Sequence, residues 1–227
     1  MQHEHSSVFP SIFSIIHWAD EHSSYILSNV LFTSKVAFCG GLVAIVIAVS
    51  LSSTCSLFPR VLLLVKGLSV VTQTLPIIAV APILIVIFGQ GFLIQVLISA
   101  LIAFFPLLFT TSNAVSLKYN QTSELVRALA LSSKKKFRYI TIPGVQLGVA
   151  EGITTTATLC IVGAIIGEFV SPNESGIGAA MLRAMKAYNF EALFAWFLAA
   201  MFIGLLAYLI SFFISKYLLY LVYTKCE

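Results

Sequence analysis

Charged side chains are scarce in this chain of 227 residues. Lysine, arginine, aspartate and glutamate make up 10% of it, whereas hydrophobic residues make up 59% and the mean hydropathy is +1.00. Soluble globular domains average about 25% charged residues, so the composition excludes an ordinary water-soluble fold. The length allows about five or six membrane spans of ~20 residues each. No stretch outside such spans is long enough to form a separate domain.

Sequence motifs for nucleotide binding and for hydrolytic chemistry are also absent. The chain has no GxxxxGK(S/T) loop, no HExxH, no nucleophile elbow, and no Asp, His and Glu cluster with metal-ligand spacing. We therefore expect no enzyme activity, no catalytic residue, no metal and no cofactor in this chain. The net charge of +4 is interpreted as a sign of membrane orientation, and no nucleic-acid partner is expected.

Cysteine pairs are missing as well. The four cysteines are widely separated and form no CxxC motif, so we interpret them as packing residues and not as a disulfide framework or a metal site. All four histidines lie in the N-terminal tail, where His3 and His5 could hold a metal but are better explained as solvated residues. No basic segment precedes a short hydrophobic core and a cleavage site, so no removable signal peptide is expected.

Long hydrophobic runs dominate the rest of the sequence and predict an all-α integral membrane protein. The apolar run from 61 to 88 contains Pro76 and Pro82, which predict a tilted or broken helix. Gly89-Gln90-Gly91 predicts a tight turn. The predicted spans cover residues 29–51, 61–88, 92–113 (with Pro106), 146–169 and 192–215.

The segments outside these five spans are short. Residues 1–27 form a tail in which 8–18 predict an interfacial helix, and a sixth span arises if this segment inserts. Residues 170–190 predict a polar loop with a short helix. The transmembrane domain is thus placed at 28–223, and it includes a cytoplasmic segment at 116–143.

A charged island from Lys118 to Arg138 interrupts the apolar sequence and carries six of the thirteen basic residues. Thr122-Ser123 followed by Glu124 predicts the start of a helix over 122–133, with a hydroxyl cap and an acid in the first turn. One interpretation is a basic helix lying on anionic lipid. The other is a helix that docks on a cytoplasmic partner and passes movement to the spans.

Counting basic residues in short loops gives an orientation. If the island is cytoplasmic, about nine basic residues lie inside and two, Arg183 and Lys186, lie outside. The positive-inside rule then predicts an N-terminus outside and a C-terminus inside the cell.

The fourth span contains glycine at every fourth position and a group of threonines. Gly144, Gly148 and Gly152 are followed by Gly163 and Gly167, a spacing that lets helices approach closely in lipid. The threonine hydroxyls at 154, 155, 156 and 158 need partners or water. Two compatible interpretations remain open: a tightly packed helix pair, and a helix that also lines a polar pathway.

The same span holds two acids, Glu151 and Glu168, at positions predicted to lie near its two ends. We interpret them as interfacial or hydrogen-bonded structural acids. The alternative function for the whole chain is an autonomous secondary carrier or membrane enzyme in which these two acids do the work.

Several motifs, in a fixed order, resemble one family of membrane proteins. They are Leu75–Ile83 with two prolines, Phe88-Gly89-Gln90-Gly91, Ala103-Phe104-Phe105-Pro106, Glu124 to Ala130 with Ile142-Pro143, Ile166-Gly167-Glu168, and Ser175-Gly176-Ile177-Gly178. Together they resemble the permease subunits of bacterial ATP-binding-cassette importers, in the branch that imports nitrate, sulfonate, taurine and thiamine-precursor pyrimidines. In the family's Glu-Ala-Ala signature, Leu125-Val126 replaces the alanine pair and Ala130 replaces the glycine.

The resemblance implies the type I importer permease fold in a bacterial cell membrane. It implies two permease copies as a homodimer, cytoplasmic ATPase subunits that hold ATP and magnesium, and an extracytoplasmic binding protein. Many relatives carry an additional N-terminal span, which this chain lacks or has reduced.

We assign three groups of candidate site residues. The predicted ATPase-coupling residues are Ser123, Glu124, Arg127, Ala128, Leu129 and Ala130. The predicted pathway or hinge residues are Pro76, Pro82, Pro106, Gly152, Thr155, Thr156 and Gly163. The predicted outer gate or binding-protein contact comprises Glu168, Ser175, Gly176 and Gly178.

Overall fold

The computed structural model describes residues 10–74, 76–172 and 175–224, and all regular structure in these ranges is helical. His3, His5 and Cys226 lie outside the described residues. The elements are α1 (Ile12–Glu21), α2 (Ser23–Cys55), α3 (Pro59–Thr72), α4 (Ile77–Phe88), α5 (Phe92–Ala128), α6 (Ser133–Lys136), a π-helical segment η1 (Phe137–Thr141), α7 (Ile142–Val170), α8 (Ile177–Lys186) and α9 (Phe190–Thr224).

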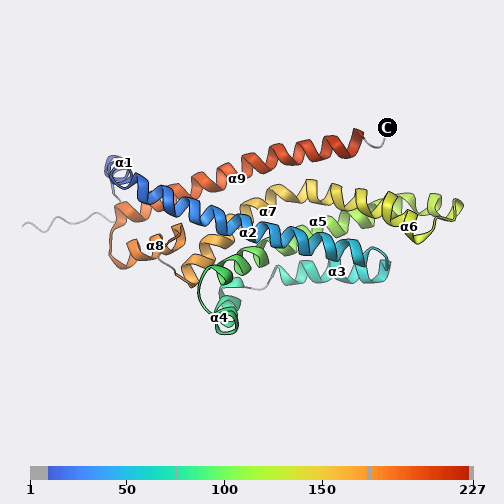
Figure 1. Ribbon diagram of the computed structural model, residues 1–227, viewed down its shortest axis with the longest axis horizontal. Coiled ribbons are helices and arrows are strands. Elements are labelled where there is room, and N and C mark those ends of the chain that lie inside the picture. The colour runs from blue at the N-terminus through green and yellow to red at the C-terminus, as the bar shows by residue number, and fades with distance from the viewer. Residues whose placement is uncertain (1–9, 75, 173–174, 225–227) are drawn as a thin grey trace, which may run out of the picture.

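Four long helices run along one axis and form the bundle in Figure 1. The helices α2, α5, α9 and the continuous segment Ser133–Val170 are each long and apolar enough to cross a membrane. The 37 residues of α5 correspond to about 55 Å of helix, whereas the hydrocarbon core is ~30 Å thick. One end of α5 must therefore project beyond the bilayer. We name the two ends of the bundle the α8 end and the α6 end.

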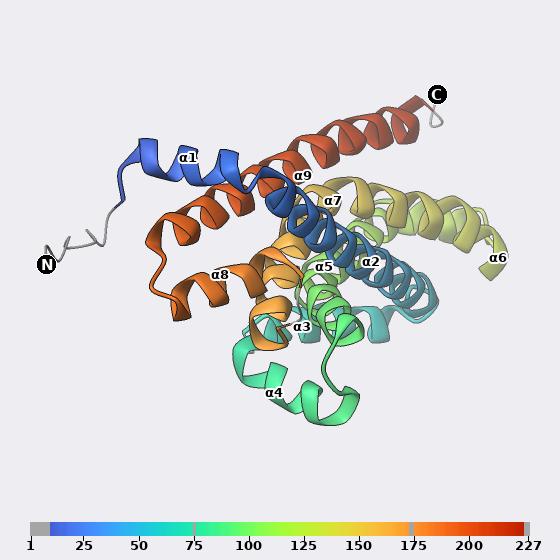
Figure 2. The same cartoon turned by 60° about the vertical axis from the view of Figure 1, so that its left-hand side comes forward.

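The second predicted span is broken, as expected from its prolines. The helix α3 ends at Thr72, and α4 begins after Pro76, which is its N-cap. With 14 and 12 residues, the two pieces are about 21 and 18 Å long, so neither crosses the membrane alone. Figures 1 and 2 show α4 turned out of line with α3. Pro82 lies inside α4 without ending it, and Pro106 lies inside α5.

The N-terminal helix α1 is too short to add a sixth span. Its ten residues give about 15 Å of helix, and Figure 2 shows it lying across the α8 end of the bundle. The rings of Trp18 and Trp196 meet edge to face with centroids 6.0 Å apart, and Tyr25 contacts the same Trp196 ring at 5.5 Å. A short helix is thus present in the predicted tail and packs on α9 through aromatic rings, and its place at the membrane interface stays a prediction.

The turns and the buried cysteines also follow the expectations. Gly89 and Gly91, which flank the turn into α5, have φ values of 78° and 126°, a region that L side chains rarely adopt. The described cysteines are all free; Cys55 and Cys160 are buried among apolar side chains and Cys39 is half-buried. They act as packing residues.

Candidate functional site

The helices α5 and α7 form the closest pair in the bundle. A Cβ atom at Gly148 would overlap the backbone of Thr111, and one at Gly163 would lie 2.7 Å from the Cα of Ser99. The backbones are therefore too close for any larger residue at these positions. The same holds along the interface for Gly144 and Gly167, whereas a Cβ at Gly152 would overlap the side chain of Thr110. The predicted tight packing of this helix is confirmed.

A polar stripe runs along another side of α7. Glu151, Thr154, Thr155 and Thr158 recur at intervals of three and four residues, which places them on one helical face. Glu151 and Thr155 are exposed and the other two are half-buried. Thr156 points elsewhere, since it is buried and its hydroxyl donates to a carbonyl four residues earlier at 2.8 Å. Only the exposed stripe is thus available to line a polar pathway.

At the α8 end, two side chains of α2 bind the start of α8. The backbone N–H of Gly176 donates to Asn29 Oδ1 at 2.7 Å, and that of Ile177 donates to Thr33 Oγ1 at 2.9 Å. Both acceptor side chains are buried. The first N–H groups of a helix have no partner within it, so these contacts cap α8 from another helix.

Glu168 of α7 completes this cap. Its side chain is fully buried, and Oε2 accepts from the N–H of Gly178 at 2.8 Å and from the hydroxyl of Thr33 at 3.0 Å. A carboxylate at a helix N-terminus is also favoured by the helix dipole. Gly176 lies directly against this carboxyl group, which a Cβ at that position would overlap. Glu168 is therefore a hydrogen-bonded structural acid, one of the two roles expected, and it lies in the interior.

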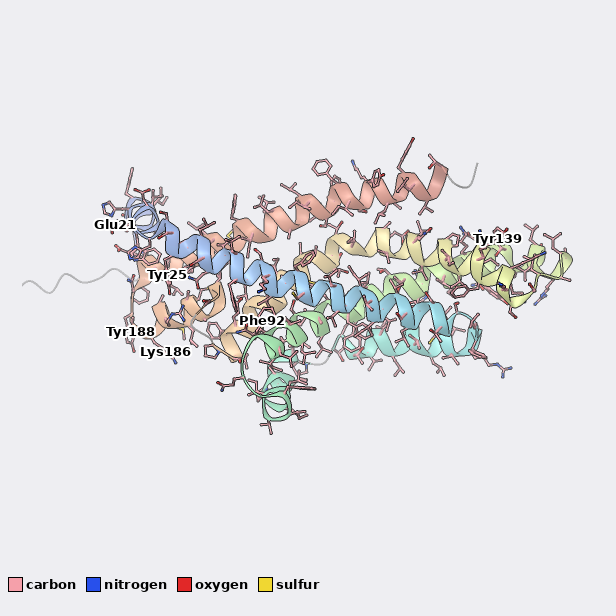
Figure 3. All side chains as sticks on the ribbon, in the orientation of Figure 1. Glu21, Tyr25, Phe92, Tyr139, Lys186 and Tyr188 are labelled. Carbon is pink, nitrogen blue, oxygen red and sulfur yellow. The ribbon has the colours of Figure 1, made fainter. Side chains whose placement is uncertain are left out.

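A second group of contacts ties the turn before α5 to the end of α7. The N–H of Gly91 donates to Ser171 Oγ at 3.1 Å, and Gln95 Nε2 donates to the Ser171 carbonyl at 2.8 Å. On the surface, Arg183 donates to the hydroxyl of Tyr25 at 2.9 Å. Figure 3 shows Tyr25, Lys186 and Tyr188 gathered at this end. The α8 end is thus joined by contacts between helices distant in sequence.

The predicted helix start at Thr122 is wrong. The helix α5 continues through this position to Ala128. The hydroxyl of Thr122 donates to the Lys118 carbonyl at 2.8 Å and that of Ser123 to the Asn120 carbonyl at 2.9 Å, both within α5. These hydroxyls are occupied by preceding carbonyls and cap no new helix. Glu124 consequently lies in the last turns of α5.

The end of α5 forms a Schellman motif. The N–H of Leu131 donates to the Val126 carbonyl and that of Ala130 to the Arg127 carbonyl, both at 3.2 Å. Ala130 has φ of 45°, the left-handed conformation that this motif requires and that glycine adopts most easily. The chain then turns into α6. We name residues 122–136 the α6-end hairpin.

The α6-end hairpin is exposed and basic. Leu125 and Leu129 are 60% and 62% exposed, and Glu124 and Arg127 are also exposed. A pocket of about 480 Å³ lies here, lined from the end of α5 by Tyr119, Ser123, Val126 and Arg127 and from the turn and α6 by Ala130, Leu131 and Lys136. The predicted coupling residues therefore lie together on one projecting element, with Ala128 exposed among them.

Neither a metal site nor a paired-acid site exists in the described part of the chain. No group of three His, Cys, Asp or Glu side chains there could hold a metal ion. Glu151 and Glu168 are 17 residues apart on α7, which corresponds to about 25 Å, so they form no common site.

The model of the family of binding-protein-dependent transport system inner membrane components matches residues 40–223 of this chain. The chain belongs to this family. Members are transport permeases and not enzymes, and the long apolar helices make this permease a multi-pass membrane protein.

Two curated relatives are permease proteins of ABC transporters. The formylaminopyrimidine transport permease ThiX of Halalkalibacterium halodurans is 26% identical over 189 residues, covering 83% of this chain and 75% of the relative. The riboflavin transport permease RibX of Chloroflexus aurantiacus is 31% identical over 123 residues. That match covers 54% of this permease and 46% of the length of RibX.

Sequence reasoning missed Asn29, Thr33, Gln95 and Ser171, which hold the α8 end together. Two signals were present. A polar residue inside an apolar span needs a partner, and Asn29 and Thr33 are four residues apart, so they lie on one face of α2. The partners themselves lie more than 70 residues away and are invisible to any local pattern.

Proposed function

We propose that this permease is the transmembrane subunit of an ATP-driven importer. In this proposal two copies enclose a pathway for a small solute delivered by an extracytoplasmic binding protein, and cytoplasmic ATPase subunits supply the energy. The observation that carries it is the α6-end hairpin, which projects from the bundle and exposes two leucines among basic residues. An exposed apolar group with a polar rim is typical of a protein contact site.

The hairpin is well connected to the membrane spans. It continues α5 on one side and leads through η1 into α7 on the other. Because the backbones of α5 and α7 touch along their length, a force on the hairpin moves both helices together. We propose this rigid pair as the element that switches access when the ATPases close. The hairpin replaces the isolated 122–133 helix expected from the sequence.

The distribution of basic residues supports the orientation. Arg127, Lys134, Lys135, Lys136 and Arg138 lie at the α6 end, which the positive-inside rule assigns to the cytoplasm. The C-terminus is then cytoplasmic. The capped helix α8 is extracytoplasmic, where it could meet a binding protein.

The polar stripe on α7 supports a second copy. Glu151 and Thr155 are exposed on the single chain, where contact with lipid would disfavour a charged carboxylate. We propose that pairing of two copies turns these stripes toward a shared, hydrated pathway. The substrates named for ThiX and RibX, a formylaminopyrimidine and riboflavin, are both polar heterocycles, and a solute of that class fits a stripe of hydroxyl groups.

Co-purification tests the proposal. The double variant Glu124→Ala/Arg127→Ala should lose the ATPase subunit from complexes extracted from native membranes. The control Lys186→Ala/Glu191→Ala changes the same kinds of charge at the α8 end, where both side chains are exposed, and should retain it. Full retention by the first variant would contradict coupling through this hairpin, and labelling of the hairpin from outside the cell would contradict the orientation.

A further inference from the structure

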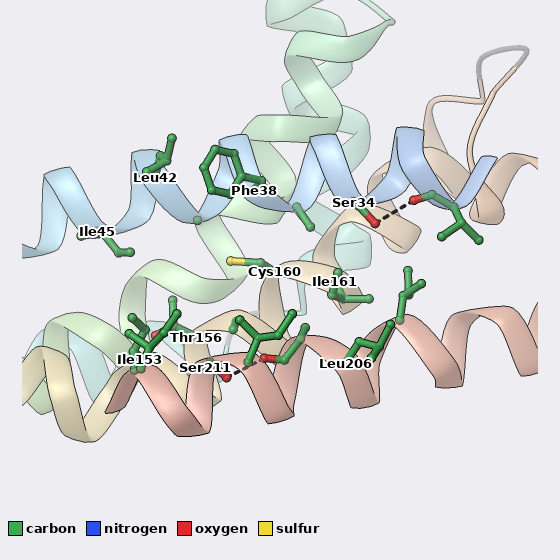
Figure 4. Close-up of a pocket in the computed structure, with 18 of the residues that line it drawn as sticks. Ser34, Phe38, Leu42, Ile45, Ile153, Thr156, Cys160, Ile161, Leu206 and Ser211 are labelled. Carbon is green, nitrogen blue, oxygen red and sulfur yellow. Dashed lines mark hydrogen bonds between the residues drawn. The ribbon is translucent and has the colours of Figure 1, made fainter. Parts of the chain in front are cut away.

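An apolar groove runs between α2 and α9 with α7 as its floor (Figure 4). Its volume is about 560 Å³. The α2 wall extends from Val30 to Ile45 and the α9 wall from Phe202 to Ile214. Both walls belong to membrane-spanning helices, so whatever fills the groove comes from the bilayer or from another membrane helix.

The hydroxyl groups in the lining of the groove have no free donor for a polar ligand. Ser34, Thr156 and Ser211 supply the hydroxyl groups of its wall. Each donates to the carbonyl four residues earlier in its own helix, at 2.7, 2.8 and 2.6 Å, and Figure 4 shows two of these bonds. Since the remaining lining is aliphatic, aromatic or thiol, the groove is suited to hydrocarbon. It differs in this from the stripe of Glu151 and Thr155.

The dimensions of the groove suit a single hydrocarbon chain. Val30 to Ile45 spans about 22 Å of helix. Dividing 560 Å³ by this length gives a cross-section of at least roughly 25 Å². A single hydrocarbon chain, at carbon contact distances, is ~4 Å wide. One acyl chain therefore fits along the groove.

Polar side chains mark one mouth of the groove. Tyr217 lies three residues beyond Ile214 on α9, and Gln146 lies seven residues before Ile153 on α7, so each continues the face that lines the groove. Both side chains are exposed. Tyrosine is enriched where membrane meets water. A phenol and an amide there can hydrogen-bond the ester and phosphate oxygens of a lipid.

We propose that this groove binds one acyl chain of a phospholipid whose headgroup lies at the α6 end, beside Tyr217 and Gln146. The groove is continuous with the lipid-facing surface of α9, where Phe202, Leu206 and Ile210 are exposed. The bound chain fills the space between α2 and α9, which pack chiefly through α7. The inference does not depend on the proposed transport cycle.

Photo-crosslinking tests the proposal on the full-length permease, purified with any subunits that accompany it. It is reconstituted in phosphatidylethanolamine–phosphatidylglycerol vesicles containing phosphatidylethanolamine with a diazirine in one acyl chain. Peptide mass spectrometry should find the label on groove residues such as Leu206. A second probe, with the diazirine in the headgroup, should label the peptides of Tyr217 and Gln146.

Matched glycine substitutions give the control. Only the Cys160 sulfur, at 3.3 Å, lies near a Cβ at Gly41, whereas nothing lies within 4 Å of one at Gly204. Gly41→Leu places its side chain in the groove and displaces about two methylenes of lipid, which should reduce groove labelling by about tenfold. Gly204→Leu points outside the groove and should leave the labelling unchanged.

Three results would overturn the proposal: wild-type permease with no acyl label in the groove, equal labelling in both glycine variants, or a disulfide between copies through Leu206→Cys. The last result would assign the groove to a second copy. The wild-type measurement stands even if Gly41→Leu fails to fold.

Discussion

At the α8 end, side chains from α2 and α7 bind the start of α8, and the polar atoms that do so are buried. At the α6 end, the hairpin is bonded chiefly to itself, through the turn at Ala130, and its leucines and charges are exposed. The two ends differ in whether other helices of the chain supply their hydrogen-bond partners. The α8 end is closed by the chain's own residues, whereas the α6 end is exposed, and we propose that a partner covers it.

Substitutions at the two ends should therefore affect different properties of the permease. Substitutions at the α8 end should change the free energy of unfolding, because they leave buried groups without partners. Substitutions on the surface of the α6-end hairpin should leave it nearly unchanged and act on assembly. Trp196 lies near the α8 end, in contact with Trp18 and Tyr25, so tryptophan fluorescence in detergent micelles reports local unfolding there.

The largest effect is expected for Gly176→Ala. Gly176 has φ of 115° and ψ of 148°, a conformation that costs other residues about 1–3 kcal/mol, and the new Cβ would overlap the Glu168 carboxyl. The displaced hydrogen bonds add to this cost, so we expect the free energy of unfolding to fall by roughly 3–5 kcal/mol. Thermal unfolding followed by fluorescence measures it. Gly204→Ala makes the same change in open space on α9 and should be neutral or slightly stabilising. An equal loss of stability in both variants would show that backbone strain at Gly176 is not the cause.

Glu168→Ala should have the next largest effect. It removes the acceptor for the Gly178 N–H and the Thr33 hydroxyl, and each orphaned donor costs about 1–3 kcal/mol. Partial hydration at the end of the bundle limits the total to about 2–4 kcal/mol. The isosteric control Glu168→Gln keeps one oxygen acceptor and should recover most of the loss. A wild-type melting temperature for Glu168→Ala would show that the cap contributes nothing.

A smaller effect of opposite sign is expected for Ala130→Gly. The left-handed conformation costs a non-glycine residue about 1–2 kcal/mol, and the flexibility of glycine in the unfolded chain offsets part of this gain. We expect a net stabilisation of about 0.5–1 kcal/mol. Hydrogen exchange at the Leu131 amide, which closes the Schellman motif, should slow. Ala128→Gly, two residues earlier in α5, should destabilise, and the same sign for both would exclude a conformational cause.

The smallest change in stability is expected for Leu129→Ala. Its side chain is 62% exposed, so the free energy of unfolding should stay within about 0.5 kcal/mol. Under the proposed function the same variant should bind the ATPase subunit more weakly, which a pull-down from detergent extracts measures. The control is Leu205→Ala, which removes a similarly exposed leucine, 57% exposed, from α9. If Leu129→Ala binds the ATPase subunit as well as the wild type does, this leucine does not contribute to the contact.

The spans, the broken second helix and the glycine packing of α7 could be predicted because each depends on a local pattern. Pro76 lies at the break of the second helix, although Pro82 and Pro106 lie inside helices, and glycines at every fourth residue mark one face whatever packs there. The helix start at Thr122 could not be judged in this way. The same hydroxyl either caps a new helix or bonds to a preceding carbonyl, and the structure has the second arrangement.

The candidate site was predictable in its residues more than in its geometry. Glu168, Gly176 and Gly178 stand out in the sequence, but the sequence does not reveal that their partners are Asn29 and Thr33. Such pairing follows from how α2 crosses α7, which is a property of the whole fold. The polar stripe of α7 is readable from spacing, whereas its exposure depends on which neighbours cover it.

The break between α3 and α4 has a consequence for water. Gln73, Thr74 and Pro76 are exposed, and they lie about 20 Å along from the start of α3, at a depth where oily surroundings do not tolerate non-helical backbone. Lipid tails must therefore be kept away from this point by solvent or by another polypeptide. The flank of the molecule that carries this break is therefore a surface that lipid does not cover by itself.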